Sequence, residues 1–181
     1  MGIYHSLYPV DPSQLQRNEA WFYEYMEERD DASWAWSQDE GAPADDPRRY
    51  LMVAYDHRYV DLINTYLETM YGVEPYSWWA GEQLEFSEHW FVMPADEVAA
   101  LADALSGPAT NAREKILGLP LDNLDLVGTF VPREGYQAIG TTRPGTVDQF
   151  WELMESLHTE LRTFYRRAAD SGQAVIGHFS G

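Results

Sequence analysis

The side chains best suited to bind a ligand lie close together in one aromatic and acidic stretch, residues 75–94. Flat aromatic faces with carboxylates between them can bind sugars, cations or bases. The sequence therefore predicts a candidate ligand-binding site in this stretch. Its members are Trp78, Trp79, Glu82, Glu85 and His89.

The same stretch also fits a core strand with its flanking turn. In an extended HWFVM segment, Trp90 and Val92 would face one way, and Phe91 and Met93 the other, so both faces would be apolar. Aromatic rings contribute most of their stabilisation through burial. Core packing is therefore the favoured interpretation, and the ligand site remains the alternative.

Known catalytic and cofactor motifs are absent, including the Walker loop, G-x-G-x-x-G, G-x-S-x-G and H-E-x-x-H. The chain has no cysteine, which excludes disulfides and thiolate metal sites. Glu155 and His158 have the spacing of a di-iron ligand pair, but no second copy exists. We expect no catalytic residue, metal or cofactor. An acid–base enzyme would need two of Glu82, Glu85 and His89 to converge in a cleft.

Composition limits the kinds of partner. The 181 residues suit one domain, and no apolar run approaches the roughly 18 residues of a membrane span. The N-terminus lacks a basic start and a long apolar run, so we expect no signal peptide and a cytoplasmic protein. The net charge of −18 disfavours nucleic acid and would attract a basic protein, but solubility is the favoured explanation of such a charge. We expect no membrane partner. The sequence leaves the oligomeric state open.

The order of expected strands and helices predicts an α+β fold. We expect a single compact domain over residues 1–181, with a mixed or antiparallel sheet packed with about four helices. Residues 29–49, rich in Asp, Pro and Gly, are predicted to form an acidic loop or insertion. Strands are expected at residues 2–10 and 173–179 and a hairpin at 119–143, with helices at 11–28, 56–71, 94–106 and 146–169.

Several segments, taken in order, resemble the YfbM-like family of uncharacterised bacterial proteins. They are MGIYHSLYPVDPSQL, YDHRYVDLINTYLETMYG, AGEQLEF, HWFVMPADEVAALADALSG and LHTELRTFYRRAADSGQAVIGHFSG. The chain departs from that family at Met93, where a polar cap is usual, and in residues 29–49 and 127–143. The resemblance implies a compact α+β fold in a bacterial cytoplasm and implies no activity.

Three functions follow from these observations. The first is a protein-interaction module whose acidic surface meets a basic partner, for example an immunity-type or regulatory binder. The second is a small-ligand binder that uses the Trp78–Trp90 stretch, with residues 29–49 as a lid. The third, ranked last, is a hydrolase-type acid–base enzyme.

Overall fold

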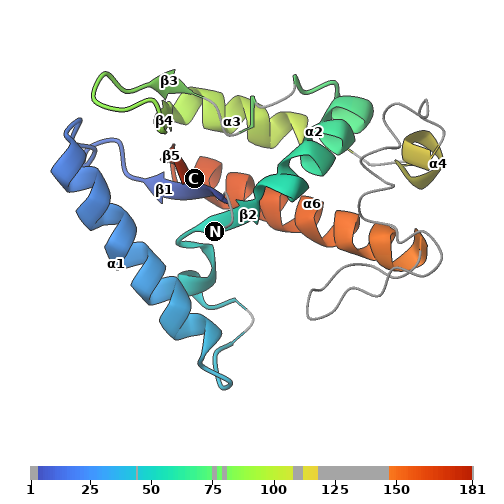
Figure 1. Ribbon diagram of the computed structural model, residues 1–181, viewed down its shortest axis with the longest axis horizontal. Coiled ribbons are helices and arrows are strands. Elements are labelled where there is room, and N and C mark those ends of the chain that lie inside the picture. Colours follow the sequence, from blue (N-terminus) through green and yellow to red (C-terminus); the bar gives the residue numbers. More distant parts are fainter. Residues whose placement is uncertain are drawn as a thin grey trace.

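A five-stranded antiparallel sheet forms the centre of the computed structural model, which describes residues 4–43, 45–74, 77–78, 81–107, 112–117 and 147–180 (Figure 1). The strand order is β2-β1-β5-β4-β3. The strands are β1 (Tyr4–Val10), β2 (Val53–Asp56), β3 (Glu82–Gln83), β4 (Trp90–Met93) and β5 (Ala174–Ser180).

Helices cover both faces of this sheet, so the predicted α+β class is confirmed. Helix α1 packs on one face, whereas α2, α3 and α6 pack on the other, and Figure 1 shows α1 across the strands from α6. The helical segments in the described residues are α1 (Glu19–Ser37), η1 (Pro47–Tyr50), α2 (His57–Tyr71), α3 (Ala95–Ala104), α4 (Ala112–Leu117) and α6 (Val147–Asp170).

The central strands are buried on both sides. In β1, Leu7 joins the core under α2, α3 and α6, whereas Tyr8 and Val10 join the core under α1. In β5, Val175 joins the core under α2, α3 and α6, and Ile176 joins the core under α1. Alternate residues of a strand point to opposite faces, so a strand with helices on both sides must be apolar throughout. This is why the two ends of the chain are rich in apolar residues.

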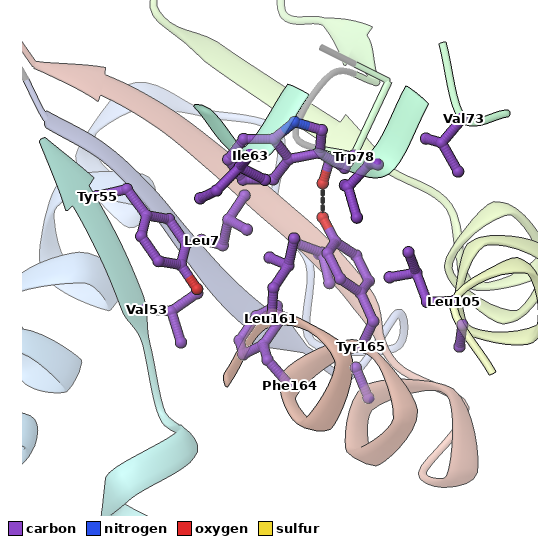
Figure 2. Packing of buried hydrophobic residues seen from close by; sticks show 14 of the residues in the cluster. Leu7, Val53, Tyr55, Ile63, Val73, Trp78, Leu105, Leu161, Phe164 and Tyr165 are labelled. Carbon is purple, nitrogen blue, oxygen red and sulfur yellow. Dashed lines mark hydrogen bonds between the residues drawn. The ribbon is translucent and has the colours of Figure 1, made fainter. Parts of the chain in front are cut away.

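The core under α2, α3 and α6 is built around Trp78 (Figure 2). Its indole N–H donates a 2.6 Å hydrogen bond to Oδ1 of Asn64. The Tyr165 hydroxyl of α6 donates to the Trp78 carbonyl. These bonds give the buried polar atoms of Trp78 and Tyr165 partners, which burial requires.

Helix α1 begins later than the sequence predicted. The start proposed at Asp11 is wrong, because Asp11 accepts hydrogen bonds from the backbone and hydroxyl of Ser13 and so forms a turn. The helix is instead capped by Asn18, whose side chain accepts from the Trp21 N–H at 3.0 Å.

Helix α1 also ends later than predicted, at Ser37, so the first part of the proposed 29–49 loop is helical. No glycine or proline interrupts residues 19–37. The guanidinium of Arg29 also lies 3.3 Å from the centre of the Tyr25 ring, one turn earlier. Beyond the helix, Arg48 bridges Asp39 at 2.9 Å and Asp46 at 2.7 Å.

The C-terminal ends of α2 and α6 agree with the sequence prediction. Gly72 after α2 and Gly172 after α6 have φ of 65° and 64°, the left-handed conformation expected after a helix. Strand β2, directly before α2, was not predicted. The predicted hairpin at 119–143 lies outside the described residues.

Gly81, just before β3, provides a test of this packing. A Cβ at this position would lie 2.3 Å from the Val92 carbonyl oxygen of β4. We expect Gly81→Ala to lower the free energy of unfolding by about 1–3 kcal/mol, because the β3 backbone must move away from β4. Urea denaturation measures the change.

Gly41→Ala is the matched control. A Cβ at Gly41 meets only the Asp39 side chain, at 3.5 Å, so we expect a change within about 0.5 kcal/mol. An equal loss of unfolding free energy in Gly81→Ala and Gly41→Ala would contradict the close approach of Gly81 to the Val92 carbonyl.

Candidate functional site

The sheet edge at β3 brings two of the predicted site residues together. Glu82 and Glu85 line a cavity of about 390 Å³ with Arg17, Leu84 and Phe86. Arg17 forms a 2.7 Å ion pair with Glu82 and lowers the pKa of that carboxyl. A carboxylate held in its ionised form is a poor proton donor, so this arrangement does not favour Glu82 as a general acid.

The other predicted members lie elsewhere. Trp78 is fully buried in the core and so takes the packing role that the sequence also allowed. His89 is exposed and stacks on Phe179, with ring centres 6.0 Å apart. Trp79 lies outside the described residues. Glu82 and Glu85 therefore line the same cavity, whereas Trp78 lies apart from them in the core.

The exposed side of α1 carries a surface of a different kind, the α1 acidic stripe. We define it as Tyr23, Glu24, Glu27, Asp31 and Trp34, which fall on one side of the helix at about 100° per residue. All five are exposed, with Tyr23 at 47% and Trp34 at 68%. The stripe thus combines three carboxylates with two large exposed aromatic rings, of which Tyr23 also packs edge-on against Trp90 with ring centres 5.8 Å apart.

A second cavity, of about 560 Å³, lies between η1 and α6 and was not predicted. Its α6 wall carries Glu152, Glu155 and Glu160, which lie on one helix face. The spacing of these three glutamates along α6 is visible in the sequence. The other wall carries Arg49 and Tyr50, which come from a distant segment, so only the folded chain could reveal the cavity.

His158 faces the core, as its position on the apolar side of α6 implies. It is 7% exposed and stacks on Tyr71, with ring centres 5.4 Å apart. Burial, and to a smaller degree the charge of Arg162, lowers the pKa of His158 to about 4. No group of three or more His, Cys, Asp or Glu side chains suited to a metal ion occurs in the part of the chain that the structure describes.

No protein-family model matches the chain, and no curated protein matches it in sequence. Among solved structures it is similar to the crystal structure of a protein of unknown function, YfbM from Escherichia coli. The identity is 14% and the TM-score 0.42, over 99% of this chain and 100% of that chain. The α+β assignment rests on the strands and helices of this chain itself. Within the described residues, no helix has the length and apolar character needed to cross a bilayer.

His158 makes stability depend on pH. Its pKa is about 4 in the folded protein and about 6.5 when unfolded, so the unfolded state binds more protons between these values. His158 alone should therefore lower the free energy of unfolding by up to about 3 kcal/mol as the pH falls from 6.5 towards 4. His178, whose pKa burial also lowers to about 4, should add to this loss. We expect His158→Phe to lose less stability over this interval, measured by urea denaturation at several pH values.

Tyr4→Phe is the control, because Tyr4 is an exposed ring on β1. It should keep the pH dependence of the parent protein. If the free energy of unfolding of His158→Phe depends on pH as strongly as that of the parent protein, His158 is not the group responsible.

Proposed function

We propose that this protein is a protein-interaction module that binds a basic partner through the α1 acidic stripe. An immunity-type or regulatory binder would fit this role. The observation that carries the proposal is the exposure of Tyr23 and Trp34 among carboxylates on one helix face. Membership of the YfbM-like family and a bacterial cytoplasmic location remain predictions of the sequence.

Aromatic exposure supports this choice of surface. Among the described residues, the large apolar side chains that remain exposed are Tyr4, Tyr23 and Trp34. Two of these three lie on α1, about 16 Å apart along the helix axis. Exposed tryptophan and tyrosine rings are the usual anchors of protein interfaces, where they bury large areas at small entropic cost.

Charge supports a basic partner. Helix α1 contains six acidic residues and one basic residue, and the whole chain has a net charge of −18. Such a field speeds the encounter with a positively charged protein and repels acidic ones. The aromatic rings then supply the apolar contact that holds the complex, because exposed ion pairs alone contribute little.

A salt-dependent binding experiment tests the proposal. The intact chain is used to capture basic proteins at low salt, and the affinity of a purified captured protein is then measured by titration. We expect Trp34→Ala to weaken binding at least ten-fold, since central aromatic anchors contribute about 2 kcal/mol or more. Glu27→Lys should also weaken binding relative to the parent protein. This loss of affinity should be larger at low salt, because charges are screened less.

Two variants serve as controls. Tyr4→Ala removes an exposed ring from β1, and Glu68→Lys reverses an exposed charge on α2. Both should leave affinity within about two-fold of the parent, since neither lies in the stripe. Equal binding by Trp34→Ala and Tyr4→Ala, or retention of no basic protein, would refute the proposal.

A further inference from the structure

A third cavity, of about 490 Å³, lies between α1 and the connection that leads into this helix from β1. The connection contributes one hydroxyl and two amides, from Ser13, Gln14 and Gln16. Helix α1 contributes two aromatic rings and one residue of each charge. The cavity is lined by other residues than those of the α1 acidic stripe, so it offers a separate surface.

The α1 wall of this cavity is a row of planar groups. Trp21, Tyr25 and Arg29 are four residues apart and so lie along one side of the helix. The Trp21 ring stacks on Tyr25 with centres 4.7 Å apart, and the Arg29 guanidinium lies 3.3 Å from the centre of the Tyr25 ring. The Tyr25 hydroxyl donates a 2.6 Å hydrogen bond to the Pro9 carbonyl, which holds the row against β1. A wall held in this way loses little entropy when a ligand binds.

Arg29 has more hydrogen-bond donors than the protein uses. Its side chain is only 18% exposed, and its Nε lacks a hydrogen-bond partner in the part of the chain that the structure describes. The Glu28 carboxylate lies 3.6 Å from Nη1, which is too far for a hydrogen bond. A guanidinium carries five N–H groups, and leaving them without acceptors in a largely buried position is costly. Because Arg29 lines the cavity, a ligand there can supply the missing acceptor oxygens.

The charges around the cavity favour a neutral ligand. Glu28 lines it together with Arg29, so the lining carries one charge of each sign. Asp11 adds a negative charge nearby, where its carboxylate accepts two hydrogen bonds from Ser13. Burial raises the pKa of Tyr25, and the charges of Glu28 and Asp11 raise it further. These carboxylates would repel an anion, and Arg29 would repel a cation.

A sugar ring has the chemistry that this lining requires. Each sugar hydroxyl both donates and accepts hydrogen bonds, as do the side-chain amides of the opposite wall. Two adjacent hydroxyls can pair with the parallel N–H groups of a guanidinium or with the two oxygens of a carboxylate. The apolar C–H face of the ring can pack on an aromatic side chain, here Trp21.

We propose that this cavity binds a neutral sugar in its pyranose form. The sugar ring packs against Trp21, and its adjacent hydroxyl groups pair with Arg29 and Glu28. The amides of Gln14 and Gln16 bind the hydroxyls on the opposite side of the sugar. The site does not depend on the function proposed for the α1 acidic stripe.

Titration of the full chain with glucose, galactose, mannose and N-acetylglucosamine tests the site. Binding is followed through the indole N–H signals in NMR spectra, and the signal of Trp21 is identified by its absence from Trp21→Phe. Glucuronate and protonated glucosamine, which add one charge to the same ring, serve as comparison ligands at equal ionic strength. We expect at least one neutral sugar to shift the Trp21 signal and to bind at least five-fold more tightly than either charged sugar. Binding of no neutral sugar, or equal or tighter binding of a charged one, would overturn the proposal.

Two variants locate the sugar. Arg29→Met keeps an unbranched side chain beside Tyr25 and removes the guanidinium, so it should weaken binding of the tightest neutral sugar about ten-fold. Gln16→Ala should weaken binding several-fold and leave the resistance to urea unchanged, because Gln16 is exposed. Gln38→Ala, at an exposed position just beyond α1, is the matched control and should bind like the parent. Binding by Arg29→Met or by Gln16→Ala as tight as that by Gln38→Ala would refute the site.

The same ring occurs in free sugars and in polysaccharides, so a six-unit oligomer of the tightest neutral sugar forms a second arm. At least ten-fold tighter binding of the oligomer assigns the site to polysaccharides, and equal or weaker binding assigns it to free sugars. Trp34→Ala should bind the sugar like the parent protein. This result separates the test of the cavity from that of the α1 acidic stripe.

Discussion

The antiparallel pairing of β1 with β5 holds the centre of the sheet together. Seven residue pairs, from Tyr4 with Ser180 to Val10 with Ala174, join segments near opposite ends of the chain. This pairing closes a very long loop, whose entropic cost must be offset by burial on both faces of the two strands. Every other strand is added outward from this pair, β2 beside β1 and β4 and then β3 beside β5.

This central pair also determines where function can lie. Because helices cover both faces of the sheet, the exposed sites lie at its two edges and on the outer sides of the helices. At the β3 edge, Glu82 is already paired with Arg17. Near the β2 edge, Tyr55 reaches α6 and faces Glu160. The outer side of α1 keeps Tyr23 and Trp34 in solvent. These three places differ in chemistry because different segments meet at each.

The distribution of charge distinguishes the candidate sites more clearly than the net charge does. Arg17 and Arg48 are paired with acidic side chains, so the ion pairs at Glu82, Asp39 and Asp46 are locally balanced. The carboxylates of the α1 acidic stripe have no arginine or lysine among them. Glu160 is compensated by Arg49 only in part. Of these places, the outer side of α1 and the concave region between η1 and α6 therefore carry more acidic than basic side chains.

Sequence patterns correctly predicted the α+β class, both terminal strands, the extents of α2 and α3, and the glycines after α2 and α6. These follow from local rules: apolar periodicity, capping, and the left-handed conformation that glycine adopts easily. It also predicted the two-sided burial of β4, with Trp90 and Val92 on one face and Met93 on the other. Three features could be known only from the folded chain: the burial of Trp78 in the core, the continuation of α1 to Ser37, and the contact of Tyr55 with Glu160. Each of these depends on contacts between segments distant in the sequence, which local patterns do not encode.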